Sequence, residues 1–529
     1  MILVRSIKLP PGSGEDALRA AAAKKLGVGV GEIRELRLVR RSLDARRKDS
    51  INFVYSLAVG LKSGEDKILK RLAGADVSRY DEPRYDIPRI GPCAERPVVV
   101  GFGPAGMFAA LLLARAGARP IVIERGADVD ARVAAVERFR TRGVLDTECN
   151  VQFGEGGAGT FSDGKLNTGT HDARLSFVLR QFAEHGAPES VVYDAKPHIG
   201  TDVLVDVVRN IRQDIIAHGG EVRFSSRLDA LEIEGGSLRG ARISGGGEEY
   251  LLPCRQLILS IGHSARDTFE ALLAQGVPMT RKPFSMGVRI EHSQRDIDLA
   301  QYGHEHGALP PADYSLSVHL PDGSSAYTFC MCPGGEVFAA ASESGGVVTN
   351  GMSYSRRDGE RANSALLVTL HAEDFPGEGV LAGMYWQRKI ERAAYDYGGG
   401  NYLAPAQLVG DFLARRPSSG ARSVSPSYRP GVVWGDIRAV LPEEIWSVLE
   451  RALPELGKKL RGFDAPDAVL TAPETRSSSP VRILRGADLS SEITGLYPCG
   501  EGAGYAGGIS SAAVDGLRCA EAVLKVLDK

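Results

Sequence analysis

Cysteine and lysine residues suited to redox chemistry occur in two short segments of the sequence. The first is Cys330-Met331-Cys332, a C-x-C pair followed by Pro333 and two glycines, and the second contains Lys165 after a glycine-rich run. A zinc or iron–sulfur site needs more ligands at close spacing, and the sequence holds no second cysteine pair, so we expect no metal. A C-x-C disulfide closes a tight, strained ring, which disfavours a redox dithiol. We interpret the pair as buried structural thiols, with a proton donor or thiol nucleophile as the alternative.

Charged residues with weaker signals extend the set of catalytic candidates. A strand would place Arg289 and Glu291 on one face and His292 on the other, so that two side chains of one face could bind a carboxylate or move a proton. An exposed strand face of ion pairs is an equally good interpretation. Lys165 could stabilise negative charge on a reduced cofactor, or it could simply pair with a neighbour on a loop. Two further candidates without an assigned role are His198 and Arg476.

The elements that must position this chemistry begin with a glycine-rich turn. Residues 98–100 read as a buried strand, an apolar helix follows, and residues 121–123 read as a second strand that ends in Glu124. The G-x-G-x-x-G turn between strand and helix allows a sharp turn, close approach of a pyrophosphate and close helix packing. The helix N-terminus would bind the diphosphate, and Glu124 would accept hydrogen bonds from a ribose. The residues expected at this dinucleotide site are Gly101, Gly103, Pro104, Ala105, Gly106, Glu124 and Arg125.

Two later segments decide which dinucleotide binds. A buried strand from residue 257 ends in Gly262, and a strand-like run at 495–499 is followed by glycines and a helix at 510–527. In flavoproteins of this fold, such a late segment returns to the first sheet, and its acid contacts the ribitol of FAD. NAD dehydrogenases do not need this return, so the order of elements predicts FAD rather than NAD. The residues expected to contact FAD here are Gly262, Gly500, Glu501, Gly507, Gly508 and Ile509.

Residues 154–166 also match G-x-G-x-x-G by their letters. No strand-like run precedes Gly154, so we interpret this segment as a loop and not as a second nucleotide fold. Its glycines would let the backbone lie against the flavin or its pyrophosphate. The residues expected to contribute are Gly156, Gly157, Gly159, Lys165 and Leu166.

Five long motifs carry a resemblance to a known family. They are residues 101–106, 152–166, 328–335, 474–480 and 500–509. In these motifs the chain resembles bacterial FAD-dependent dehydrogenases of largely unassigned function, which are flavoproteins with an N-terminal ferredoxin-like domain. The resemblance covers nearly the whole chain. It implies a flavin oxidoreductase but names no substrate.

The first 90 residues are expected to form a ferredoxin-like α+β domain, because their patterns follow a β-α-β-β-α order. This unit holds 19 Lys and Arg residues against 12 Asp and Glu residues. We interpret its basic cluster as a solvated loop and strand edge, and a docking surface for RNA, an acidic protein or an anionic substrate is the alternative. The cluster comprises Arg40, Arg41, Arg46, Arg47 and Lys48. The expected elements are strands at 2–9, 33–41 and 51–61 and helices at 15–26 and 65–72.

The remaining chain is expected to form an α/β, Rossmann-like FAD-binding fold with an inserted α+β substrate domain. A proline-punctuated linker at 83–97 would separate it from the first unit. The expected domains are 1–90 (ferredoxin-like), 91–282 (first part of the FAD-binding domain), 283–463 (substrate domain) and 464–529 (return to the FAD-binding domain). In the substrate domain we expect strands at 287–291, 315–320 and 336–341 and helices at 361–370 and 380–392.

Composition suits a large globular enzyme. The 529 residues are 43% hydrophobic and 25% charged, and the formal net charge of -2 argues against general attraction to nucleic acids or membranes. Seven scattered cysteines do not form a secreted disulfide framework, and the longest apolar stretch is far too short to span a membrane. We therefore expect a protein of the reducing cytoplasm.

The predicted activity is that of an FAD-dependent oxidoreductase. FAD would be held non-covalently, and a hydride would pass between its N5 atom and a C–H, C=C or C=N bond of a small organic substrate. NAD(P)H could bind transiently as the reductant. Two alternatives stay open: a flavin-dependent RNA-modifying protein that docks through its basic N-terminal domain, and a non-catalytic flavin sensor.

Overall fold

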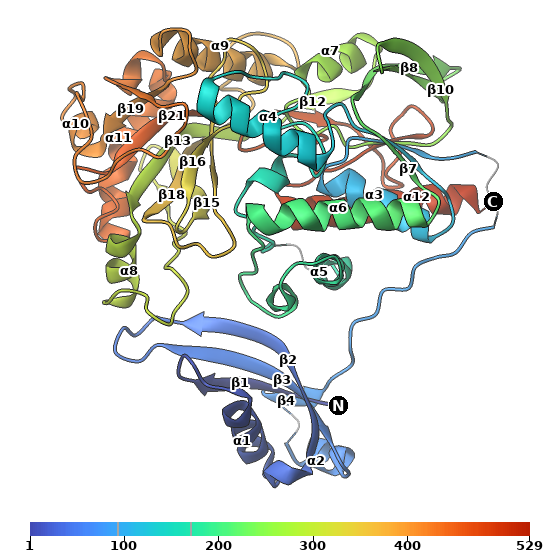
Figure 1. Cartoon of the computed structure of the whole chain (residues 1–529), viewed down its shortest axis with the longest axis vertical. Helices are drawn as coiled ribbons and strands as arrows, with labels where there is room; N and C mark the ends of the chain where they lie inside the picture. The colour runs from blue at the N-terminus through green and yellow to red at the C-terminus, as the bar shows by residue number, and fades with distance from the viewer. Residues whose placement is uncertain (73, 92–94, 170–171, 529) are drawn as a thin grey trace.

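The computed structural model describes residues 1–529 apart from 73, 92–94, 170–171 and 529. An N-terminal sheet domain lies at one end of the molecule, and a five-stranded sheet and a seven-stranded sheet organise the rest (Figure 1). Residues 80–91 leave the N-terminal domain as a long segment without helix or strand (Figure 1). The expected linker at 83–97 includes residues 92–94, which lie outside the described residues.

The N-terminal domain is a four-stranded antiparallel sheet with two helices on one face (Figure 1). Side chains of the sheet such as Ile2 and Val4 pack against Leu26 and Ile68 of the helices. The predicted β-α-β-β-α order is confirmed, and a fourth strand follows that is too short to carry a periodic pattern. The strand order is β2-β3-β1-β4, and the elements are β1 (Ile2–Leu9), α1 (Glu15–Leu26), β2 (Ile33–Asp44), β3 (Asn52–Leu61), α2 (Glu65–Leu72) and β4 (Val77–Arg79).

Basic residues of the β2–β3 hairpin attach this domain to the rest of the chain. The guanidinium of Arg41 donates two hydrogen bonds to Asp194, at 2.7 and 2.9 Å. The Lys48 ammonium donates to the carbonyl of Ala300 at 2.7 Å. Arg46 is exposed, as expected of a solvated edge. For Arg41 and Lys48 the interpretation as a solvated edge is wrong, because both side chains bind other parts of the same chain.

A five-stranded parallel sheet forms the centre of the second part of the chain. Val98 and Val100 face one side of this sheet and Val99 the other, and all three are buried because both faces are covered. Helices α3 (Pro104–Arg115), α6 (Thr201–Ala217) and α12 (Ile509–Leu527) cover one face, and the antiparallel strands β8 (Ser226–Glu234), β9 (Ser237–Gly245) and β10 (Glu248–Pro253) cover the other. The strand order is β23 (Leu496–Pro498), β11 (Leu257–Leu259), β5 (Val98–Val100), β6 (Ile121–Ile123) and β7 (Glu221–Arg223). The predicted Rossmann-like fold and its late return through β23 are confirmed.

A seven-stranded mixed sheet forms the third part. Its central strands are buried on both faces, and helix α11 (Glu443–Lys459) packs against one face of the sheet. The strand order is β14 (Ser317–His319), β15 (Ser325–Cys332), β18 (Arg361–Leu370), β13 (Phe284–Ser293), β21 (Val469–Glu474), β19 (Ala404–Leu408) and β20 (Val432–Trp434).

One predicted element of this sheet is wrong. Residues 361–370 were expected to form a helix, and they form strand β18 between β15 and β13. Eight of its ten residues are buried and the other two are half-buried, and a short run that is buried on both faces has no period that separates a strand from a buried helix. The other expected elements of this part are present as β13, β14, β16 (Glu336–Ala339) and α9 (Ala382–Tyr397).

The remaining elements connect and cover the sheets. They are α4 (Val129–Arg142), α5 (Arg174–Glu184), α7 (Arg266–Ala274), α8 (Gln294–Tyr302), α9 (Ala382–Tyr397), α10 (Val409–Leu413), the pair β12 (Met279–Arg281) and β22 (Val481–Ile483), the pair β16 (Glu336–Ala339) and β17 (Thr349–Met352), and 3₁₀ helices at Val30–Glu32, Ala158–Phe161, Glu189–Val192 and Ile437–Ala439. No helix in the described part of the chain is both long enough and apolar enough to cross a lipid bilayer.

Candidate functional site

A cavity of about 440 Å³ lies where the parallel sheet meets the seven-stranded sheet. Its walls contain most of the residues predicted to bind a cofactor, although these come from five separate segments. Those that line it are Gly101, Gly103, Pro104, Ala105, Glu124, Arg125, Gly157, Gly159, Lys165, Gly262, Glu501, Gly507, Gly508 and Ile509. The seven-stranded sheet contributes Thr328, Phe329, Cys330, Met331 and Glu474. Predicted residues outside the lining are Gly106, Gly156, Leu166, Gly500, Arg289 and Cys332.

The glycines of the first turn serve two different purposes. A Cβ atom at Gly101 would overlap the carbonyl oxygen of Ser260, and one at Gly106 would overlap the carbonyl of Gly101. Close backbone packing therefore requires these two glycines. Gly103 differs, because the atom nearest to its Cβ position is the Cα of Gly157 at an ordinary 3.7 Å. It is the N-cap of α3, where no side chain caps the helix.

A second helix begins in the same cavity. The N-cap of α12 is Gly508, which also provides no side-chain cap. Cβ atoms at Gly262, Gly507 and Gly508 would meet nothing within 4 Å, so these glycines leave open space along the cavity wall. Two helix N-termini without a side-chain cap, from distant parts of the chain, thus reach one glycine-lined cavity, an arrangement that favours anionic or electron-rich groups. This cradle fits a dinucleotide.

Glu124 organises the backbone around the first turn. Its carboxylate accepts hydrogen bonds from the backbone N–H groups of Phe102 at 2.8 Å, and of Gly126 and Gly154 at 2.9 Å each. The side chain is only 5% exposed, yet it lines the cavity. A carboxylate offers roughly four acceptor positions, so about one remains for a ligand hydroxyl.

The segment 154–166 packs directly against the first turn. It contains no strand, and a 3₁₀ helix follows its glycines, which confirms the predicted loop. A Cβ at Gly157, where φ is 62°, would approach the Cα of Gly103 to 2.8 Å. The end of the loop reaches the second sheet, because the ammonium of Lys165 donates to the carbonyl of Met331 and lies 2.6 Å from Asp163. Lys165 therefore lies in the cavity wall and is also ion-paired.

Three charged or titratable groups shape the electrostatics of the cavity. The guanidinium of Arg125 lies 4.1 Å from the ring centroid of Phe153 and pairs with carboxylates outside the cavity. Burial raises the pKa of Glu501 to about 7, against the opposing effect of Lys282. Burial lowers the pKa of His263 to about 3, so this imidazole is neutral. His263 was missed from the sequence, although it directly follows the predicted Gly262.

The C-x-C pair lies on the wall opposite these helix ends. Cys330 lines the cavity with φ at 43°, at a point where the pairing of β15 with β18 shifts register, and Cys332 is buried behind it. The interpretation as buried structural thiols therefore suits Cys332 only. Arg289 is fully buried beneath them, donating to the carbonyl of Cys330 at 2.7 Å and pairing with Glu474 at 3.0 Å. The exposed face of ion pairs offered for Arg289 is wrong, because β13 is covered on both sides.

Of the other sequence candidates, Glu291, His292 and His198 lie outside the cavity lining. Glu291 accepts hydrogen bonds from Ser427, and burial raises its pKa to about 7. The Nε2 atom of His292 lies 2.8 Å from the carbonyl of Phe463. His198 contacts a backbone carbonyl next to the cavity, whereas Arg476 lines the cavity and pairs with a buried glutamate. Arg289 and Glu291 therefore do not form one binding face.

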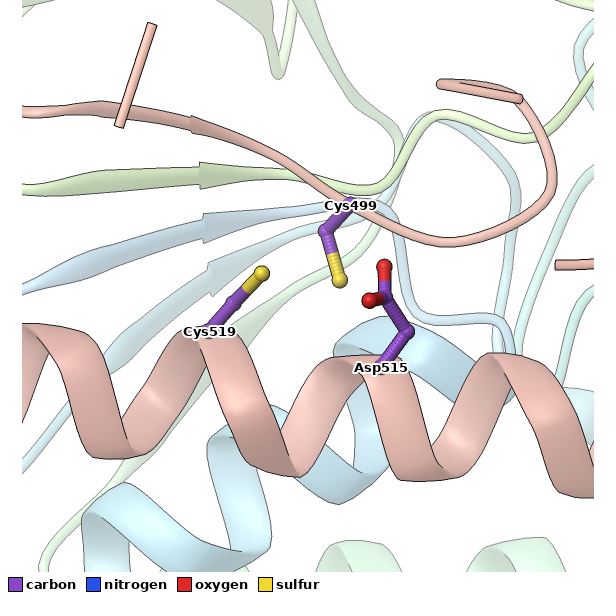
Figure 2. A group of neighbouring side chains, drawn as sticks. All are labelled: Cys499, Asp515 and Cys519. Carbon is purple, nitrogen blue, oxygen red and sulfur yellow. The ribbon is translucent and has the colours of Figure 1, made fainter. Parts of the chain in front are cut away.

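A group of metal-ligating side chains lies behind the return loop. Figure 2 shows Cys499 at the end of β23 facing Asp515 and Cys519 on α12, and their ligand atoms lie within 4.8 Å of one another. Arg485 already supplies a cation there, since it donates to both carboxylate oxygens of Asp515 at 2.6 and 3.0 Å and lies 3.4 Å from the sulfur of Cys519. Asp515 also accepts the N–H of Gly500 at 2.8 Å, which fixes the start of the return loop.

Comparison with known proteins assigns the two large parts of the chain separately. Residues 96–258 match an FAD binding domain, residues 283–477 match the C-terminal domain-like region of FAD-dependent proteins, and residues 1–60 match a domain of unknown function. Among solved structures, a triple mutant of the flavin-dependent brominase Bmp2 is 13% identical with a TM-score of 0.38, and the match covers 82% of this chain and 80% of that one. A geranylgeranyl bacteriochlorophyll reductase-like protein from Thermoplasma acidophilum is 14% identical with a TM-score of 0.37, covering 82% and 79%.

A much nearer relative covers the whole chain. An uncharacterized protein of Clostridium beijerinckii is 47% identical over 537 residues, which span 100% of this chain and 99% of the relative. The residues that match the FAD binding domain include strands β5, β6 and β7 and the first glycine turn, which build one wall of the cavity; the return glycines at 500–508 lie outside this match. The chain therefore belongs to the family of this Clostridium protein, in which an FAD binding domain is joined to the C-terminal domain of FAD-dependent proteins.

Proposed function

We propose that this protein is an FAD-dependent oxidoreductase that transfers a hydride between the flavin and a small organic substrate. The observation that carries the proposal is the convergence of two uncapped helix N-termini, α3 and α12, on one glycine-lined cavity. The same cavity continues to the seven-stranded sheet, where substrate groups would bind. FAD, when bound, would supply the two-electron chemistry at its N5 atom.

The chain itself would hold the cofactor without a covalent bond. The first turn of α3 would bind the diphosphate through unpaired N–H groups, and the free acceptor position of Glu124 would receive a ribose hydroxyl. Glu501 would face the ribitol, and the start of α12 at Gly508 would face the electron-rich edge of the flavin. Lys165 would favour the anionic reduced form through its charge.

The substrate would enter on the side of Lys165 and β15, and NAD(P)H would bind there only transiently. We also propose that the N-terminal domain is ferredoxin-like, since its strand order β2-β3-β1-β4 fits that fold. Its contact with Asp194 brings the β2–β3 hairpin near Lys196, which lines the cavity. Such a placement favours a role in covering the substrate entrance over a role in RNA docking.

Purification and anaerobic reduction would test this proposal. The protein should be yellow, and denaturation should release FAD that chromatography identifies. Flavin absorbance followed under anaerobic conditions should then bleach with NADH, with NADPH or with a member of a metabolite panel. A colourless protein that takes up no added FAD would refute the proposed cofactor, and a yellow protein that no donor reduces would favour the flavin sensor.

A further inference from the structure

Two cations of the cavity wall share a single buried carboxylate. Asp163 is fully buried, and its Oδ2 atom accepts hydrogen bonds both from the ammonium of Lys165, at 2.6 Å, and from Nη2 of Arg357. Its Oδ1 atom accepts a further hydrogen bond from Nε of Arg357 at 2.9 Å. Because both cations bind the same oxygen, the lysine and the arginine lie side by side. Both side chains line the cavity.

Each of the two cations keeps a donor that no acceptor in the described part of the chain takes up. An arginine side chain has five N–H groups and a lysine side chain has three. Arg357 donates to Asp163 from Nε and Nη2, which leaves its Nη1 atom without an acceptor. Lys165 donates to Asp163 and to the carbonyl of Met331, which leaves its third N–H. The side chain of Arg357 is only 10% exposed, so a partner for Nη1 would come from the cavity that it lines.

The other charged side chains on this side of the cavity do not supply an anion for these donors. Each interacts with its own partner of opposite charge: Lys196 with Asp313, Glu474 with Arg289, Arg476 with Glu391, and Glu501 of the return loop with Lys282. Burial raises the pKa values of Glu474 and Glu501 to about 7, and their protonation only makes the cavity more positive. Burial, together with the charge of Arg357, lowers the pKa of His198, so this neighbour of Lys165 is neutral at neutral pH. Among the described residues, Asp163 is the one carboxylate within 4 Å of either cation, so the pair retains one positive charge.

We propose that Lys165 and Arg357 form a carboxylate-binding subsite, and that the substrate is a monocarboxylate with an apolar carbon skeleton. Nη1 of Arg357 and the third N–H of Lys165 would donate charge-assisted hydrogen bonds to the carboxylate oxygens. The single negative charge of a carboxylate matches the one positive charge that the pair retains. Phe329 is 38% exposed and lines the same cavity, so it offers an apolar surface for the carbon skeleton. The substrate class rests on the proposed function, whereas the subsite itself does not require the flavin.

Calorimetric titration of the full-length protein as purified tests the subsite. The probe is 3-phenylpropionate, and 3-phenylpropanamide is the neutral control, because it has nearly the same shape without the charge. The carboxylate should bind about 10- to 100-fold more tightly than the amide, since hydrogen bonds to a charged group are stronger than those to a neutral one. Inorganic phosphate, added as a competitor, should not displace the probe at equal concentration.

Matched variants separate the subsite from the overall charge of the cavity. Lys165→Met and Arg357→Met should each weaken 3-phenylpropionate about tenfold or more while leaving the affinity for the amide unchanged. Arg357→Lys keeps a cation beside Asp163 if Arg357→Met does not fold, and it should show the same selective loss because it has no Nη1. Lys196→Met is the control, since it removes a lysine of the same lining that is exposed and already bound by Asp313. Its affinity for the carboxylate should stay within about threefold of the parent value, because exposed ion pairs contribute little.

The outcomes distinguish the subsite from the proposed function. Equal affinities for the acid and the amide, an equal loss in Lys196→Met, or displacement of the probe by phosphate would overturn the carboxylate subsite even if the protein is yellow and reducible. Loss of FAD from Lys165→Met and Arg357→Met, without any preference for the carboxylate in the parent, would assign the two cations to the cofactor and overturn the subsite as well. A colourless protein that takes up no FAD but prefers the carboxylate would support the subsite and contradict the proposed oxidoreductase.

Discussion

Replacing Glu124 by alanine tests how the cofactor site is built. The substitution leaves three backbone N–H groups, those of Phe102, Gly126 and Gly154, without their shared acceptor. A hydrogen bond to a charged group contributes about 1.5–3 kcal/mol. If water from the cavity replaces one of the three bonds, the other two amount to roughly 3–6 kcal/mol of local stability. FAD binding should weaken by about 1.5–3 kcal/mol as well, because the ribose loses its acceptor.

Hydrogen exchange in the flavin-free protein measures this local loss, since a chain with several parts has no single free energy of unfolding. In Glu124→Ala, exchange in the segments that contain the three amides should accelerate about 100-fold or more. Glu124→Gln is the matched control. Its amide oxygen can still serve Gly126 and Gly154, so only the exchange at Phe102 should rise, by about tenfold.

Equal exchange in the parent and in Glu124→Ala would refute this account of the site. It would mean that the three amides have other acceptors and that the carboxylate does not hold the turn. An FAD affinity that stays within a factor of two of the parent value would show that a different acid contacts the ribose.

The other predictions concern the glycine turn, the buried ion pairs and the cysteines. Gly103→Val should fold but lose flavin because its side chain enters the cavity, whereas Gly106→Ala should lower the melting temperature even without flavin; equal behaviour of the two variants would contradict their different packing. Lys165 and Arg357 hold the pKa of Asp163 below its usual range despite its burial, so the ionised group stabilises the fold above about pH 4 and this contribution is lost as the pH falls. Asp163→Asn should therefore melt below the parent at pH 7, with a gap that narrows towards pH 3. Anaerobic titration should take up two electrons per flavin in the parent and in Cys332→Ser, and an uptake of four in the parent alone would reveal a redox dithiol.

Local patterns predicted most of the parallel sheet and its loops. The turn at Gly101, the strand that ends before Gly262 and the return at Gly500 each combine an apolar strand with a glycine of positive φ. Such signals are contained within a few residues. Their meeting in one cavity followed from the strand order of the fold, which the order of motifs in the chain also indicated.

Long-range packing set the limit of prediction in the seven-stranded sheet. Strand β18 is covered on both faces, so its sequence lacks the alternation of polar and apolar residues that identifies a strand. Arg289 was predicted to be exposed because its buried partners come from the distant strands β15 and β21. The partners of Glu124 were missed for a similar reason. These partners are the backbone N–H groups of Phe102, Gly126 and Gly154. Every residue type except proline has such a group, so the sequence does not indicate which of them a carboxylate will bind.

The two walls of the cavity therefore differ in how they are built, and this difference bears on their chemistry. The cofactor wall relies on glycines and helix ends, whose N–H groups bind any dinucleotide of suitable shape and carry little information about the reaction. The opposite wall relies on buried charges, with Arg289 below Cys330 and Lys165 beside it. Burying each of these charges costs free energy of desolvation, and a packed apolar wall would not carry this cost. Under the proposed function, the choice of substrate would therefore depend mainly on this charged wall beside Cys330.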